Sequence, residues 1–561
     1  MSKNYFLVLS MAVVAALTSC KKLGDLSADN FTVTPTPLEV NAGKVATTID
    51  GKFPEKYMKK KAVVTVTPVL KYEGGEVKGQ SATFQGEKVE GNDQTISYKV
   101  GGTYTMKSVF DYVPAMQQSD LYLQFDAKVG KKTVTVPEVK VGYGVVSTSQ
   151  LLKNTLASVT PSLAADTYQR IISEKQEANI KFLIQQATVR KSELNSNNVK
   201  EFVKMMKQIN DEQETKALRN IEISAYASPD GALDLNTRLA EQRQGNSEKY
   251  VQKELKAIKM EAEVDAKYTA EDWDGFQELV AASNIQDKEV IVRVLSMYKD
   301  PEEREAQIKN MSSVFKELAD EILPELRRAR LTLNYEVIGR SDVQIEEQFK
   351  EDASKLNVEE LLYGANLDFI TDKAAWYKKT TELYPNDYRA YNNLGLLAYQ
   401  KGDMATAESF FNKAKSINSN AAAVNANLAL IELGKGNVAA AETYVGKAAG
   451  AEGLNEAMAC LNIAKGSYGQ AASTVNEVVS NSAALAQILN KDYASAKATL
   501  ENVTNKDAYT SYLKAVVAAR TKDVAGVSSN LREAFRLDSS LINRAKKDLE
   551  FAAYKSVIDS F

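Results

Sequence analysis

The stretch that decides the fold of the middle of the chain is residues 221–251, which read IEISAYASPDGALDLNTRLAEQRQGNSEKYV. Ile221 and Ile223 alternate with polar residues, a pattern that predicts a half-buried strand. The Ser-Pro-Asp-Gly run that follows predicts a tight turn, because proline fixes φ and glycine tolerates a positive φ. Leu235 and Leu239 then recur one helical turn apart, which indicates a helix. A strand end, a turn and a helix start therefore bring polar groups together in one crevice.

This stretch resembles the peptidoglycan-binding motif of the OmpA-like domain family. The motif has a Tyr, a turn Gly and then Asn, Leu and Arg at fixed offsets, and these offsets are matched by Tyr226, Gly231, Asn236, Leu239 and Arg243. The resemblance implies an α+β domain of βαβαβ order. It also implies a crevice that holds the amino and carboxylate groups of a diaminopimelate side chain in the cell-wall peptide, a zwitterion that needs one anion and one cation on a fixed frame.

One position departs from that family. Ser228 stands where the family has the aspartate that holds the amino group, and Asp230 is the candidate to supply the missing charge. The residues expected to bind peptidoglycan are thus Ser228, Asp230, Asn236 and Arg243. The alternative is an ordinary βα unit in which Arg243 is a solvated charge on the helix.

We expect this domain to cover residues 177–340, with a helical insertion at about 271–328 before a final alternating strand. The insertion begins Glu-Asp-Trp-Asp-Gly, which resembles a Glu-Asp-Trp element of a subset of OmpA-like bacterial lipoproteins and fimbria-associated proteins. Its carboxylates lack the number and spacing of a calcium loop. A turn that starts a helix is the better interpretation, and no metal site is predicted.

The N-terminus predicts export. Residues 1–19 have the charged start and short apolar run of a signal peptide. They end Leu-Thr-Ser before Cys20, which resembles the bacterial lipobox. The resemblance implies that Cys20 carries several acyl chains, which together give a stable anchor. We expect residues 20–30 to be a tether from the outer membrane, on the periplasmic side because Lys21 and Lys22 replace an acidic cluster. Cleavage as a plain secreted protein is the alternative.

Residues 31–148 show short alternating runs between glycine-rich breaks, and we expect an immunoglobulin-like β-sandwich. Residues 149–176 are polar and are expected to form a linker helix. An acidic stretch at 341–357 predicts a second linker or a connecting helix.

Residues 358–558 predict an all-α solenoid of tetratricopeptide repeats. Apolar and small residues recur 34 positions apart, as in Leu394 and Leu428, and 34 is the period of that family. Stacked helix pairs leave a concave groove that suits a protein partner. Asn393 and Asn427 are candidates for polar groups in this groove, and the alternative is that they are surface asparagines.

Composition narrows the function. The chain of 561 residues has a formal charge of −3 and no histidine. A nucleic-acid partner is not expected from that charge. Without histidine, the usual general base and most zinc and haem sites are excluded, so we predict no enzyme, no catalytic residue and no cofactor. Cys460, the only cysteine besides Cys20, lies in an apolar helical pattern and predicts a buried thiol.

Two functions fit these parts. The first is a non-catalytic scaffold lipoprotein of the cell envelope that is anchored in the outer membrane, binds peptidoglycan and recruits a protein partner to its repeats. The second is a surface adhesin, or an accessory lipoprotein of fimbrial or secretion assembly, whose OmpA-like domain no longer binds peptidoglycan.

Overall fold

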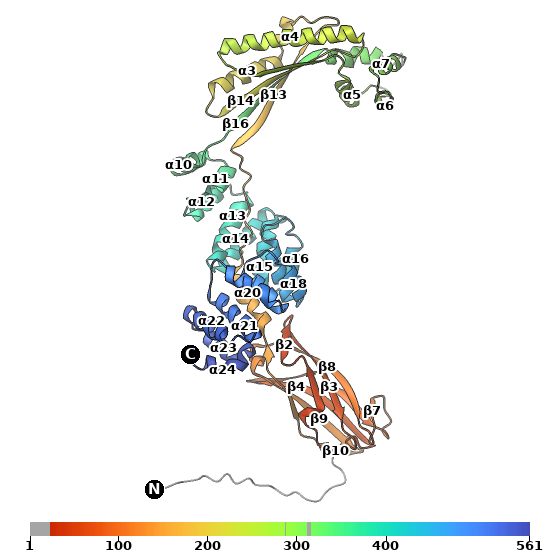
Figure 1. The fold of residues 1–561 in the computed structure, drawn as a ribbon, viewed down its shortest axis with the longest axis vertical. Coiled ribbons are helices and arrows are strands. Elements are labelled where there is room, and N and C mark those ends of the chain that lie inside the picture. Colours follow the sequence, from red (N-terminus) through yellow and green to blue (C-terminus); the bar gives the residue numbers. More distant parts are fainter. Residues whose placement is uncertain (1–22, 286–287, 311–315) are drawn as a thin grey trace, which may run out of the picture. The chain divides into compact units, whose positions relative to one another are not determined.

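The structure is a computed structural model, and it describes residues 23–285, 288–310 and 316–561. The predicted signal peptide and the predicted lipidation site Cys20 lie outside these residues. The contacts divide the chain into two compact units, drawn in Figure 1. The sandwich–repeat unit consists of the described residues up to Asp166 together with Asp368–Phe561, and the central unit is Thr167–Leu367. Among the described residues, no helix has the length and apolar character that crossing a membrane requires.

The N-terminal region folds as two β-sheets around one core, which confirms the prediction of a β-rich region. Buried and exposed residues alternate along the long strands, so each sheet has one apolar face. Ile49, Val64 and Leu123 come from both sheets and are fully buried in the shared core. The first sheet contains β1 (Phe31–Thr34), β2 (Leu38–Asn41), β3 (Lys44–Phe53), β8 (Gly102–Asp111) and β12 (Val145–Val146). The second contains β4 (Ala62–Tyr72), β5 (Gly75–Lys78), β6 (Ala82–Gly86), β7 (Gln94–Ile96), β9 (Asp120–Val129), β10 (Lys132–Thr135) and β11 (Val139–Tyr143).

The linker helix expected at 149–176 does not form over most of that range. Short helical turns run from η3 (Thr148–Leu151) through α1 (Leu152–Thr155) to η4 (Leu156–Ser158). Residues 159–170 are not helical, and a strand starts at Ile171. Pro161 gives a physical reason, because proline lacks an N–H and disfavours helical dihedrals in the residue before it. Residues 156–166 are called the connector below.

The central unit contains a four-stranded sheet with the order β13-β16-β14-β15. Strands β14 and β15 are parallel, and the other pairs are antiparallel. Helices α3 and α4 pack against the sheet and supply Phe202, Met206, Val251 and Leu255 to its core. The elements are β13 (Ile171–Lys181), α2 (Lys191–Leu194), α3 (Asn197–Asp211), β14 (Lys216–Tyr226), α4 (Leu233–Ile258), β15 (Val264–Thr269) and β16 (Arg328–Ile338).

Helices form most of the described residues between β15 and β16, at the place expected for an insertion. Asp272 caps the first of them, since its carboxylate accepts a hydrogen bond of 2.9 Å from the Gly275 N–H. A small core of its own, which includes Phe276 and Leu318, holds these helices together. They are α5 (Trp273–Ala282), α6 (Lys288–Met297), α7 (Pro301–Asn310), the π-helical turn η5 (Leu318–Ile322) and α9 (Leu323–Leu326).

The boundary between the central unit and the repeats differs from the expected one. The acidic stretch at 341–357 contains a helix, α10 (Asp342–Asp352), and α11 (Val358–Ala365) follows it. We predicted that the repeats start at residue 358, but α11 belongs to the central unit, whose last residue is Leu367. Arg340 explains this, because its guanidinium pairs with Glu360 of α11 at 2.8 Å and ties that helix to the end of the sheet.

The C-terminal region is an array of helix pairs. In α13 and α14 the two helices approach closely at Gly395, where an added Cβ would lie 2.6 Å from the ring of Phe411. The helices are α12 (Lys373–Leu383), α13 (Tyr388–Gln400), α14 (Met404–Ile417), α15 (Ala422–Lys435), α16 (Val438–Val445), α17 (Leu454–Ala464), α18 (Tyr468–Thr474), α19 (Asn481–Leu489), α20 (Tyr493–Asn502), α21 (Ala508–Arg520) and α22 (Val524–Leu537). The chain ends with α23 (Leu541–Lys547), η7 (Leu549–Tyr554) and α24 (Lys555–Ile558).

Candidate functional site

All four residues selected from the central motif line one small cavity of about 60 Å³, where β14 ends and α4 begins. They are Ser228, Asp230, Asn236 and Arg243. The cavity, called the crevice below, is also lined by Gln185 and by a residue that the sequence analysis did not select, Arg327.

Arg243 is buried, with 1% of its surface exposed, so the alternative of a solvated helix charge is wrong. Its guanidinium donates to three backbone carbonyls: to Tyr226 at 2.8 Å, to Gln186 at 3.0 Å and to Leu183 at 3.3 Å. It also lies over the ring of Phe182, 5.1 Å from the centroid. Arg243 therefore joins the end of β14 to the loop that follows β13.

Asn236 holds the turn closed. Its side-chain amide donates to the carbonyl of Gly231 at 2.9 Å, and only 4% of the residue is exposed. The turn backbone is thus tied to the first turn of α4, which fixes the position of Asp230.

Asp230 is paired within the protein. Its carboxylate accepts a hydrogen bond from the Ser228 hydroxyl and forms an ion pair of 3.2 Å with Arg327. The Nε of Arg327 also donates to the Ser228 hydroxyl oxygen at 3.2 Å. Ser228 therefore does not replace an aspartate directly but joins a triad with Asp230 and Arg327.

Arg327 lies just before β16, the strand that pairs with β14. Antiparallel pairing places Ala329 opposite Ala225, so the residues just before β16 lie beside the turn after β14. Arg327 falls at the end of the range predicted for the helical insertion, about 271–328. Its place beside the turn follows only from the pairing of β14 with β16.

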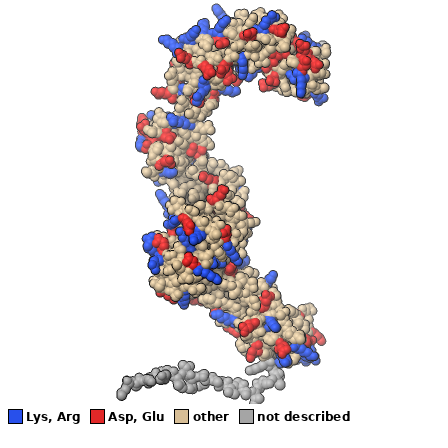
Figure 2. All heavy atoms as spheres, in the orientation of Figure 1, with Lys and Arg blue, Asp and Glu red and all other residues tan. Residues whose placement is uncertain are grey.

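Burial controls the electrostatics of the crevice. It lowers the pKa of Arg243 to about 10, and the positive charge of Arg327 acts in the same direction while Asp230 opposes it. Arg243 thus remains a cation at neutral pH. Figure 2 shows acidic and basic side chains interspersed over the visible surface of each unit, so the concentration of cations in the crevice is a local feature.

A second set of polar groups lies on the face of the repeat helices that contacts the connector, called the groove below, and it binds the connector. The Asn427 amide donates to the carbonyl of Ser162 at 2.8 Å and accepts from its N–H at 2.6 Å. The Asn393 amide makes the same pair of bonds with Ala164, at 3.0 and 2.9 Å. Two asparagines that are 34 residues apart thus bind two backbone positions that are two residues apart.

The groove continues this pattern along the connector. Asn392 donates to the same Ser162 carbonyl at 3.0 Å, and Tyr399 donates to the carbonyl of Leu156 at 2.7 Å. Glu456, from the next helix pair, accepts a hydrogen bond from the backbone of Thr160, and burial raises its pKa. Asn393 and Asn427 are fully buried, so the alternative that they are surface asparagines is wrong. The peptide that they hold is part of the same chain, and a role in binding a partner stays a prediction.

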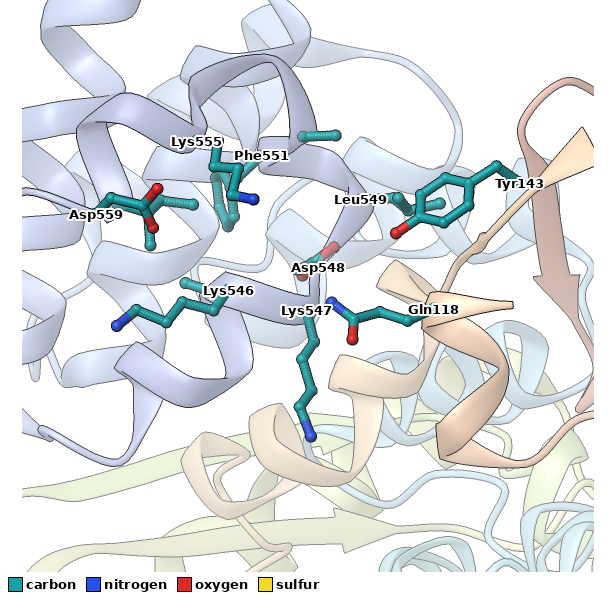
Figure 3. Close-up of a pocket in the computed structure, with 12 residues that line it drawn as sticks. Gln118, Tyr143, Lys546, Lys547, Asp548, Leu549, Phe551, Lys555 and Asp559 are labelled. Carbon is teal, nitrogen blue, oxygen red and sulfur yellow. The ribbon is translucent and has the colours of Figure 1, made fainter. Parts of the chain in front are cut away.

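A cavity of about 440 Å³ lies at the C-terminal end of the sandwich–repeat unit (Figure 3). Gln118 and Tyr143 of the β-sandwich line one side of it. Lys546, Lys547 and Asp548 line another, and the Asp548 carboxylate accepts a hydrogen bond of 2.8 Å from the hydroxyl of Tyr512. Its lysines are exposed, and no motif in the sequence points to these residues.

Comparison with known proteins identifies the repeats. Residues 388–420, which cover α13 and α14, match the family model of the tetratricopeptide repeat. No curated relative matches the chain. The C-terminal region is therefore a tetratricopeptide-repeat region, a type of module that binds proteins.

The solved structures that match this chain have low sequence identity to it. A tetratricopeptide repeat protein from Parabacteroides merdae has 14% identity and a TM-score of 0.27, and the match covers 39% of this chain and 88% of that one. The APC/C hetero-tetramer Cut9–Hcn1 has 14% identity and a TM-score of 0.30, with coverage of 36% and 44%. Yeast Tom70 has 12% identity and a TM-score of 0.24, with coverage of 58% and 74%. The repeat assignment rests on the match at 388–420 and on the helix pairs.

Proposed function

We propose that this chain is a non-catalytic scaffold lipoprotein of the cell envelope. Cys20 anchors it in the outer membrane on the periplasmic side, the crevice of the central unit contacts the diaminopimelate peptide of peptidoglycan, and the repeats take part in protein binding. The observation that carries the proposal is the common cavity of Ser228, Asp230, Asn236 and Arg243, which the OmpA-like motif had selected.

The arrangement of the central unit supports the OmpA-like resemblance. Its strands and helices follow one another as strand, helix, strand, helix, strand, and a last strand inserts between the first two. The crevice lies at the end of β14, where backbone groups and the first turn of α4 converge. Such a place suits recognition of a small charged group that projects from a polymer.

The groove restricts how the repeats bind a partner. Each of Asn393 and Asn427 already makes two hydrogen bonds with the connector backbone. A protein partner that uses these amides has to displace residues 160–164. We therefore place partner binding in the groove in competition with the connector.

Sedimentation with purified diaminopimelate-type sacculi tests the wall contact. The full chain, kept soluble in detergent, is expected to pellet with the sacculi. The Arg243→Ala variant is expected to stay in solution. The Gln185→Glu variant is expected to pellet only in part, because the substitution places a negative charge on the exposed rim of the crevice without removing a buried contact. Arg219→Ala, an exposed arginine paired with Glu336, is the control that should pellet. A wild-type chain that stays in solution rules out the wall contact.

The pairing of Asp230 with Arg327 favours a second candidate function. An anion that is already neutralised is less available to a diaminopimelate amine, as expected for a surface adhesin or a fimbrial or secretion accessory lipoprotein that has lost wall binding. Protease treatment of whole cells separates the two candidates. Protection of the central unit supports the periplasmic scaffold, and cleavage in intact cells supports surface display.

A further inference from the structure

The crevice carries an excess of positive charge. Its lining contains the guanidinium groups of Arg243 and Arg327 and the carboxylate of Asp230. The rest of the lining is uncharged and includes Ile184, Leu235 and Leu239. A cavity with two cations and one anion attracts a negative group more strongly than a zwitterion.

The one anion is already in use. One carboxylate oxygen of Asp230 accepts from the Ser228 hydroxyl and the other accepts from Nη2 of Arg327 at 3.2 Å. The side chains of Arg327 and Asp230 are 12% and 19% exposed, so water screens this ion pair only in part. A ligand ammonium that pairs with Asp230 has to break this contact.

The buried cation, Arg243, in contrast still has N–H donors that can bind a ligand. The three hydrogen bonds of Arg243 go to neutral carbonyls, and a guanidinium has five N–H donors. Among the described residues, no carboxylate forms an ion pair with it. A buried charge without a counter-ion is costly, and a carboxylate that enters the cavity would supply that counter-ion.

We propose that the crevice selects a carboxylate group and does not require a neighbouring ammonium group, because Arg327 occupies the place where the ligand's ammonium would meet Asp230. The inference rests on the proposed wall contact and narrows the class of peptidoglycan groups that the crevice binds. The ligand class is a peptide carboxylate whose nearby amine is acylated or absent, such as a diaminopimelate residue with an amide at its side-chain nitrogen. Arg327 is then the residue that sets this selectivity.

Calorimetric titration with two soluble stem peptides tests the proposal. The peptides are identical except that the side-chain amine of diaminopimelate is free in one and acetylated in the other. The full wild-type chain in detergent is expected to bind both within about threefold. Arg327→Gln frees Asp230 and is expected to prefer the free amine by roughly tenfold, which corresponds to about 1.4 kcal/mol. Arg219→Gln should behave like the wild type.

The outcomes separate the two levels of the proposal. A wild-type preference of about tenfold or more for the free amine overturns the inference and leaves the wall contact standing. An Arg327→Gln chain that still binds both peptides equally shows that Arg327 does not set the selectivity, which also overturns the inference. If the wild type binds neither peptide, the wall contact itself fails and the inference fails with it.

Discussion

The repeat groove and the crevice both gather polar side chains in a concave surface, but the groove uses neutral amides and the crevice uses charges. In the groove, each amide of Asn393 and Asn427 donates to one backbone group of the connector and accepts from another, so the connector satisfies both amides. In the crevice, Arg327 neutralises Asp230 while Arg243 has no carboxylate partner among the described residues. The connector thus occupies the groove, whereas the crevice contains a buried cation, Arg243, without a paired carboxylate.

The largest effect is expected from a substitution in the crevice that removes its buried cation. Arg243→Leu leaves three partly buried backbone carbonyls without their charged donor, so we expect the central unit to lose about 3–5 kcal/mol of unfolding free energy. Trp273 in the central unit and Trp376 in the sandwich–repeat unit are the only tryptophans. Urea unfolding followed by fluorescence in a Trp376→Phe background therefore reports on the central unit.

The matched control for this prediction is Arg219→Leu, which removes an arginine whose side chain is 65% exposed. We expect a change within about 0.5 kcal/mol for this surface substitution. Equal effects of the two substitutions would contradict the structural role of Arg243.

The next largest effect is expected from a substitution in the groove that removes one of its amides. Asn427→Leu removes both hydrogen bonds to the backbone of Ser162, and we expect the connector to lose about 2–3 kcal/mol of local stability. Hydrogen exchange at residues 159–166 should become faster by the corresponding factor. Asn543→Leu, at an exposed position of α23, should leave this exchange unchanged. Unaltered protection in Asn427→Leu would mean that the amide does not hold the connector.

A smaller effect sharpens the charge assignment of the crevice. Gln185 lines the cavity and is exposed, so a charge placed there acts on a ligand with little effect on folding. We expect Gln185→Glu to weaken and Gln185→Lys to strengthen binding of the acetylated stem peptide by about threefold each, with both effects reduced at high salt. Effects of the opposite sign would indicate a cationic ligand.

The smallest effect concerns Glu456, whose carboxylate accepts a hydrogen bond from the connector backbone. Burial raises the pKa of Glu456, so the folded chain keeps a proton that the unfolded chain releases. Its contribution to stability is therefore greatest below the usual glutamate pKa and declines as the pH rises through the raised value. We expect Glu456→Gln to become more stable than the wild type as the pH rises from 4 to 8, measured as the urea midpoint of the sandwich–repeat unit. A constant difference across this range would contradict the shift.

Features set by neighbours in the sequence could be predicted. The 34-residue period indicated the repeats because each helix pair packs mainly on the next one. Ser228, Asp230, Asn236 and Arg243 were selected through the resemblance to the OmpA-like motif, which spans one turn and the helix after it, and they line one cavity. The helix start at Asp272 followed from the same local chemistry, since its carboxylate caps the N–H of Gly275.

Features that depend on distant parts of the chain could not be predicted. Arg327 reaches Asp230 only through the pairing of β14 with β16, which the sequence does not state. The polar stretch 149–176 predicts a linker helix, whereas the non-helical course of the connector depends on amides more than 200 residues away. Pro161 was the one local signal against that helix.

Photo-crosslinking in living cells tests the central claim most directly. A photoreactive amino acid replaces Ile184, which lines the crevice and is 59% exposed, and a control chain carries it at Leu537 of α22, which is 43% exposed. After irradiation and muramidase digestion, our account predicts a muropeptide adduct at position 184 and none at position 537. Adducts at position 184 that contain only protein would contradict a wall-contacting scaffold and would assign the crevice to a protein partner.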